Sequence, residues 1–92
     1  MFVINLFITD KVGKITTQQQ VGQPVESLKT ARETLFGSIP TIKHLMADSA
    51  RINYKEEYFS VDKQENMNIL TIVMDNNKKT YKKAVFTIVP ID

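Results

Sequence analysis

The chain has 92 residues, of which 42% are hydrophobic and 24% are charged, so we expect one globular domain over residues 1–92 and not a disordered chain. The absence of cysteine excludes disulfide bonds and thiolate metal sites, and a net charge of +2 is too small to indicate a charged partner. No segment approaches the roughly 18 consecutive apolar residues that cross a bilayer, which predicts a cytoplasmic protein without membrane contact.

The first elements predicted are the two strands of a hairpin. Apolar and branched residues alternate over Phe2–Ile8, a pattern that indicates a strand rather than a signal peptide. Asp10 and Gly13 are typical of a turn, after which the chain should return over Lys14–Val21. Because this second strand is polar in its middle, we expect it at an edge of the sheet.

The periodicity changes after Gly22, where apolar residues begin to recur at helical spacing. Pro24 suits the first turn of a helix, and Gly37 suits its end. A shorter second helix is expected from about Pro40 to Ser49. Its inward residues are predicted to be Ile42, Leu45 and Met46.

The second half of the chain predicts three further strands. The apolar parity of the first of them shifts at its centre, which predicts a β-bulge near Glu56 and Glu57. The strands are expected over 51–61, 67–74 and 80–89, joined by a polar loop over 62–66 and a turn over 75–77. The expected fold is α+β, with a mostly antiparallel five-stranded sheet in the order ββααβββ and the helical segment packed on one face.

Three of the predicted strands carry apolar residues on both faces, although the helical segment is long enough to cover only one. An antiparallel sheet with one wet face should instead alternate cleanly between apolar and polar residues. Either the sheet curls on itself, or its second face packs against another copy of the chain or another protein. The candidate protein interface consists of Val3, Phe7, Ile69, Val73, Tyr81 and Val85.

Four lysines surround a tyrosine in the last predicted hairpin and form the main local concentration of charge. Contact with nucleic-acid phosphates is one interpretation, with the tyrosine stacking on a base. A lysine-rich hairpin tip that keeps the protein soluble is the other, and it is favoured because arginine is absent there. The candidate nucleic-acid contacts are Lys78, Lys79, Tyr81, Lys82 and Lys83.

No set of residues predicts catalysis, a metal site or a cofactor. His44 is the single histidine, and Asp48 four residues later offers it a hydrogen bond on one helix face, which indicates a structural or surface role. Neighbouring strand residues such as Glu56 and Glu57 should point to opposite faces, which argues against a paired acid and base. We therefore do not expect an enzyme.

The functional expectation is a small interaction or regulatory protein that associates with itself, or binds a protein partner, through its second apolar sheet face. Nucleic-acid binding by the lysine hairpin is the alternative. Lysine, isoleucine and asparagine are frequent, which is typical of coding sequence in a low-GC bacterium, or in a phage or plasmid of one.

Overall fold

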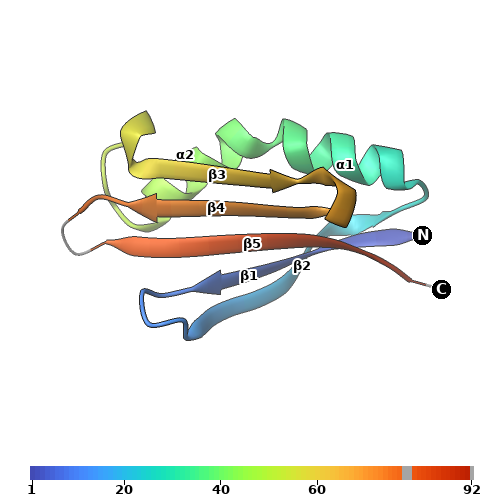
Figure 1. Cartoon of the computed structure of the whole chain (residues 1–92), viewed down its shortest axis with the longest axis horizontal. Coiled ribbons are helices and arrows are strands. Elements are labelled where there is room, and N and C mark those ends of the chain that lie inside the picture. Colours follow the sequence, from blue (N-terminus) through green and yellow to red (C-terminus); the bar gives the residue numbers. More distant parts are fainter. Residues whose placement is uncertain (78–79, 92) are drawn as a thin grey trace.

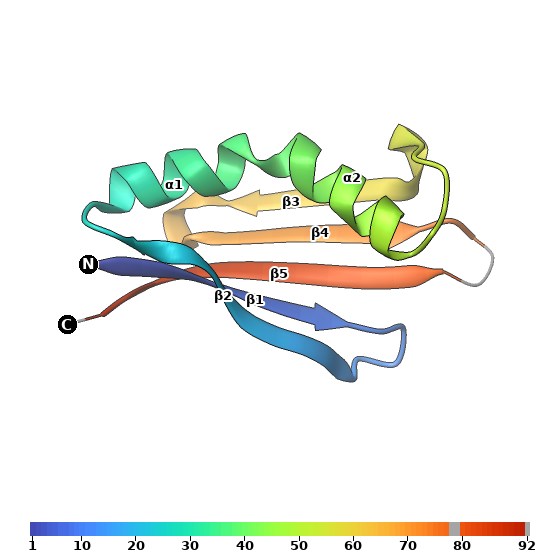
Figure 2. The same cartoon turned by 180° about the vertical axis from the view of Figure 1, so that it is seen from behind.

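Five antiparallel strands form one sheet in the order β2-β1-β5-β4-β3 in the computed structural model, which describes residues 1–77 and 80–91 (Figure 1). Two helices lie on one face of this sheet (Figure 2), so the predicted α+β fold is confirmed. The elements in chain order are β1 (Phe2–Thr9), β2 (Ile15–Val25), α1 (Leu28–Gly37), α2 (Ile39–Ser49), the 3₁₀ turn η1 (Glu56–Tyr58), β3 (Phe59–Gln64), the 3₁₀ turn η2 (Glu65–Met67), β4 (Ile69–Asp75) and β5 (Tyr81–Pro90).

The turn between β1 and β2 is held by the side chain of Asp10. Its carboxylate accepts hydrogen bonds from the backbone N–H groups of Val12, at 3.0 Å, and Lys14, at 2.9 Å. Gly13 adopts a φ of +86°, which a residue without a Cβ reaches at little cost. The hairpin predicted from Asp10 and Gly13 is therefore present, and β2 lies at the predicted sheet edge.

Strand β2 continues past Val21 to Val25, so the prediction that a helix starts at Pro24 is wrong. The register with β1 shifts just after the pair formed by Ile4 and Val21, which places extra residues on β2. Gly22 accommodates this bulge with a φ of +71°. Proline is tolerated here because an edge strand has N–H groups that no neighbouring strand needs.

Helix α1 begins at Leu28 because Ser27 caps it. Ser27 Oγ accepts a hydrogen bond from the backbone N–H of Thr30 at 3.0 Å, which satisfies one of the free donors of the first turn. After α1 ends at Gly37, Ser38 alone separates it from α2. The two helices therefore follow one another along the sheet in a single row (Figure 2).

The prediction that Leu45 faces the core is wrong. On α2, Met46 is 7% exposed and Ile42 is half-buried, whereas Leu45 is 60% exposed. Successive helical residues point about 100° apart around the axis. Since α2 packs on β4, Met46 meets the sheet, and Leu45 is turned away from the core.

The predicted strand over 51–61 is also wrong in its first part. Residues 52–55 form a connection without regular structure, and η1 follows before β3 begins at Phe59. The apolar parity shift near Glu56 and Glu57 therefore comes from a helical turn and not from a β-bulge. The polar segment expected as a loop over 62–66 supplies the second half of β3 and the start of η2, because an edge strand accommodates polar residues on both faces.

The core lies between the helices and one face of the sheet. Leu70, Ile72 and Met74 of the inner strand β4 are fully buried there. The other buried members of this cluster are Ile4, Leu6, Ala31, Leu35, Ile39, Met46, Ala84, Phe86 and Ile88. The structure thus assigns the helices to the face that carries the even-numbered residues of β1, β4 and β5.

Candidate functional site

The face of the sheet opposite the helices carries all six residues of the candidate protein interface. Phe7 of β1 pairs with Val85 of β5, and Val3 pairs with Val89 further along the same two strands. Strand alternation places the odd-numbered residues of β4 on this side as well. We call this surface the helix-free face, and its apolar members are Val3, Phe7, Ile69, Val73, Tyr81, Val85 and Val89.

Burial on the helix-free face is uneven. Val3 is 5% exposed, whereas Phe7, Val73 and Val85 are half-buried. Threonine side chains lie between the apolar ones, since Thr87 pairs with Ile69 across β5 and β4. The face therefore combines apolar side chains with small polar ones, and neither α1 nor α2 covers it (Figure 1).

Charges of both signs lie on the helix-free face and along its edge strand β3. Lys83 pairs with Val73, and Asp75 pairs with Tyr81 near the β4–β5 turn. Asp62 of the edge strand β3 pairs with Thr71. A second surface of the same kind would therefore offer unlike charges to pair with these.

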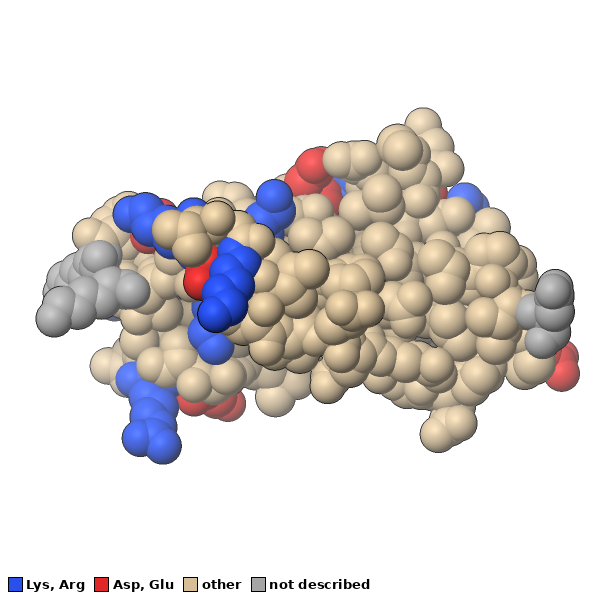
Figure 3. Space-filling model, turned by 90° about the horizontal axis from the view of Figure 1, so that it is seen from below, with Lys and Arg blue, Asp and Glu red and all other residues tan. Residues whose placement is uncertain are grey.

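The two edges of the sheet differ in charge. The six residues of β3 include Asp62 and Lys63, and 3₁₀ turns flank this strand. The eleven residues of β2 contain no charged side chain. In the view with β2 toward the reader, charged atoms gather near one end of the molecule, and the middle of the view is uncharged (Figure 3). Only the β3 edge thus has the charges that discourage pairing with another strand.

An apolar groove lies on the helix side of the sheet, between α2 and the β1–β2 hairpin. Its larger part has a volume of about 290 Å³. Leu6 and Phe86 belong to its floor, while Leu45 of α2 and Val21 of β2 line its walls. A second hollow of about 220 Å³ shares three of these residues, namely Val21, Leu45 and Phe86, and extends the groove toward α1.

The groove exists because one row of helices is narrower than the sheet. Five strands spaced about 4.8 Å apart span roughly 20 Å, whereas a helix is about 10–12 Å wide. Helix α1 packs against β1, β5 and β2, whereas α2 packs against β4, and the turn end of the β1–β2 hairpin extends beyond the helices (Figure 2). Sequence reasoning missed the groove because strand parity identifies a covered face without saying how far across it the cover extends. In the structure, the groove is revealed by Leu45, a large apolar side chain that is exposed on its wall.

The structure separates the lysines of the candidate nucleic-acid contact. Lys78 and Lys79 lie outside the described residues. Lys82 and Lys83 are successive residues of β5 and point to opposite faces, with Lys82 lining the groove. Tyr81 lies on the same face as Lys83. These two lysines therefore do not form one cationic surface.

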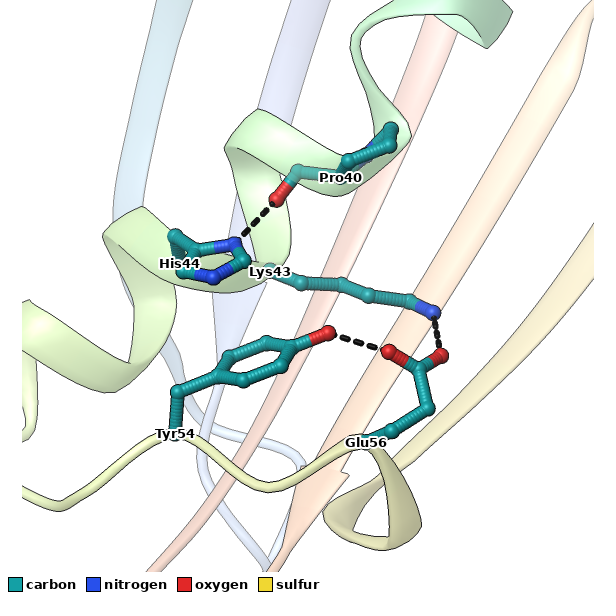
Figure 4. A network of polar contacts seen from close by, with 5 residues as sticks. All are labelled: Pro40, Lys43, His44, Tyr54 and Glu56. Atoms are coloured by element: carbon teal, nitrogen blue, oxygen red, sulfur yellow. Dashed lines mark hydrogen bonds and ion pairs between the residues drawn. The ribbon is translucent and has the colours of Figure 1, made fainter.

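A network of polar side chains joins α2 to the connection that leads to β3 (Figure 4). Glu56 accepts hydrogen bonds from Lys43 Nζ on one carboxylate oxygen and from the Tyr54 hydroxyl on the other. The Lys43 side chain is only 12% exposed, and its ammonium lies 5.9 Å from the centre of the Phe59 ring. The bonds from Lys43 and Tyr54 lower the pKa of Glu56, and the bond to Glu56 raises the pKa of Tyr54.

His44 belongs to the same network. Its Nδ1 lies 2.9 Å from the carbonyl oxygen of Pro40, which can only accept, so this nitrogen carries a proton. The imidazole also stacks on Tyr54. The predicted partner, Asp48, is not the group that His44 Nδ1 contacts. The network can fasten a loop to a helix, but it presents no nucleophile beside a free base.

The described ranges, residues 1–77 and 80–91, contain neither a cluster of metal ligands nor a membrane-spanning helix. No group of three or more histidine, cysteine, aspartate or glutamate side chains there is placed to hold a metal ion. None of the helices in these ranges is long and apolar enough to cross a membrane.

Comparison of the chain with protein-family models, curated proteins and solved structures gave no match.

Proposed function

We propose that this chain is a non-enzymatic interaction protein that associates with a second copy of itself through the helix-free face. The observation that carries the proposal is the apolar patch formed there by Phe7, Val73 and Val85, with Val3 and Val89 continuing it. Folding leaves these residues half-buried or, at Val3, buried without helical cover. Covering them further is favourable by about 25 cal/mol for each Å² of apolar surface removed from water.

A second copy suits this face for two reasons. Two sheets can pack face to face about 10 Å apart, with side chains from both filling the space between them. The charges on this face have both signs, so Lys83 of one copy can approach Asp62 or Asp75 of the other. A two-fold dimer uses the same patch twice and closes without leaving a free surface for further growth.

The test is the mass of the protein in solution, measured by light scattering and sedimentation equilibrium from low micromolar to near-millimolar concentration. The wild type should form a dimer. Val85→Glu and Val73→Glu should remain folded by circular dichroism and become monomeric. Leu45→Glu is the matched control, because it places the same charge at an exposed apolar position on the opposite side of the sheet.

Val85→Thr keeps the β-branched shape and replaces one methyl group with a hydroxyl, so it tests the face even if the glutamate variants unfold. It should weaken the dimer while leaving the fold intact. A wild type that is monomeric at every concentration contradicts the proposal. So does a dimer whose dissociation constant is the same in wild type, Val85→Thr and Val73→Glu.

A further inference from the structure

The groove on the helix side is a second uncovered apolar surface, and it is separate from the helix-free face. Leu45 is 60% exposed and Val21 is 37% exposed, which leaves two large apolar side chains in water across the groove from each other. Neither residue belongs to the buried core cluster. Stability of the fold therefore does not account for apolar residues at these two positions.

The register of the strands gives the groove a direction. Ile8 of β1 pairs with Ala84 of β5, and Leu6 pairs with Phe86, so these pairs follow one another along the floor. Lys82 precedes Ala84 and lies beyond this pair, toward the turns at that end of the sheet. The other end of the groove reaches the core residue Leu35.

Lys82 is the one charged residue among the described residues that line the two parts of the groove. Its ammonium takes part in neither of the ion pairs found within residues 1–77 and 80–91. The other polar lining groups are hydroxyls and one amide, which carry no charge. Among the described residues, a ligand in the groove thus meets a long apolar floor and a single cation at one end.

From this arrangement we infer that the groove binds a linear apolar chain that ends in a carboxylate, of the medium-chain fatty-acid type. The chain would lie along Leu6, Phe86 and Leu45, and the carboxylate would lie at Lys82. Small-ligand sites are mostly apolar, with a few polar groups that fix the orientation of the ligand. A volume of about 290 Å³ is at the small end of their range, which favours a chain of medium length.

The inference is tested by NMR titration of methyl groups with three probes that share one chain and differ in the head group. Octanoate is anionic, 1-octanol is neutral and octyltrimethylammonium is cationic, and all are used below their micelle or solubility limits. Octanoate should shift the methyl signals of Ile42, Leu45 and Val21 in a saturable way. The methyl signals of Val73 and Val85, on the helix-free face, should not shift.

Octanoate should bind about tenfold more tightly than 1-octanol, as expected for one charge-assisted hydrogen bond, and octyltrimethylammonium should bind most weakly. Lys82→Met keeps the aliphatic stem and removes the charge, so it should abolish the advantage of octanoate while leaving 1-octanol binding unchanged. Lys63→Met is the matched control, because it removes an exposed lysine from the opposite edge strand. It should change neither affinity.

Equal affinity for the three probes in the wild type would overturn the inference. An equal loss of octanoate affinity in the Lys82→Met and Lys63→Met variants would also overturn it. The absence of saturable shifts in the methyl signals of the groove would overturn it too. These results are independent of the proposed dimer, because the helix-free face is followed by its own methyl signals and by the mass of the protein.

Discussion

The rings of His44 and Tyr54 are stacked, with their centres 3.9 Å apart and their planes within 8° of parallel. His44 lies on α2, whereas Tyr54 lies in the connection between α2 and η1, so the stack fastens this connection to the helix. Phe59, the first residue of β3, extends the stack at 5.4 Å from Tyr54. The path of the chain from the helical layer to the edge of the sheet is therefore set by aromatic contacts.

The stack predicts that the ring of Tyr54 contributes more to the stability of the fold than its hydroxyl does. Tyr54→Phe keeps both ring contacts and loses only the hydrogen bond to Glu56, so it should lower the melting temperature slightly. Tyr54→Ala removes the ring from between His44 and Phe59 and should lower it clearly more. Thermal unfolding followed by circular dichroism measures both. Equal losses in the two variants would mean that the stack contributes nothing.

Glu56 predicts a specific dependence of stability on pH. Hydrogen bonds from Lys43 and Tyr54 hold its pKa in the folded protein below the ordinary value of 4.5. The unfolded chain therefore takes up a proton first as the pH falls, so stability decreases with falling pH. The contribution of Glu56 is complete above pH 4.5 and is lost as the pH passes through the lowered pKa.

Glu56→Gln should accordingly be less stable than the wild type near neutral pH, and the difference should shrink below pH 4.5. Melting temperatures of both proteins between neutral and strongly acidic pH test this. Glu57→Gln is the control, since it removes the neighbouring carboxylate of the same turn, which lies outside the network. A difference that stays constant with pH would show that the charge of Glu56 has no part in stability.

Much of the fold follows from local patterns in the sequence. The alternation over Phe2–Ile8 and the turn residues Asp10 and Gly13 are sufficient for the first hairpin, because side-chain parity and turn geometry act over a few residues. Pro24 shows where such reasoning fails. The residue suits a helix start and an edge strand equally, and the capping hydrogen bond that Ser27 Oγ accepts from the Thr30 N–H decides between them.

The candidate interface was predictable to a similar extent. Parity alone places Phe7 and Val85 on one face, and the structure pairs them across two neighbouring strands. The groove was not predictable, since it depends on how two helices in one row cover a sheet that is wider than they are. A sequence-based argument treats Leu45 as core because leucine at helical spacing is usually buried. The position of α2 over β4 makes it a groove residue instead.

Asn68 connects the helical layer to the start of β4 and predicts a graded series of variants. Arg32 Nε donates a hydrogen bond to Asn68 Oδ1 at 2.8 Å. The backbone of Asn68 is left-handed, with a φ of +58°. Asn68→Gly keeps the backbone conformation and loses the hydrogen bond, which should cost about 1 kcal/mol. Asn68→Ala loses both and should cost about 1–2 kcal/mol more.

Asn68→Asp keeps the left-handed backbone accessible and gives Arg32 a charged acceptor, so its stability should stay close to that of the wild type. Urea unfolding, with the dependence on urea concentration compared among the variants, gives the free energies. If the glycine and alanine variants are equally stable, the backbone at position 68 carries no strain.

Gly22 and Gly37 predict opposite responses to the same substitution. An added Cβ would meet no atom within 4 Å at either position, so neither response is due to a clash. Gly37 ends α1 without a positive φ, and Gly37→Ala should raise the free energy of unfolding by about 0.4–1 kcal/mol by restricting the unfolded chain. Gly22 has a φ of +71°, and Gly22→Ala should lower the free energy of unfolding by about 1–2 kcal/mol. Urea unfolding of the two variants measures the difference, and a neutral Gly22→Ala would mean that β2 does not pass through a left-handed bulge on its way to Val25.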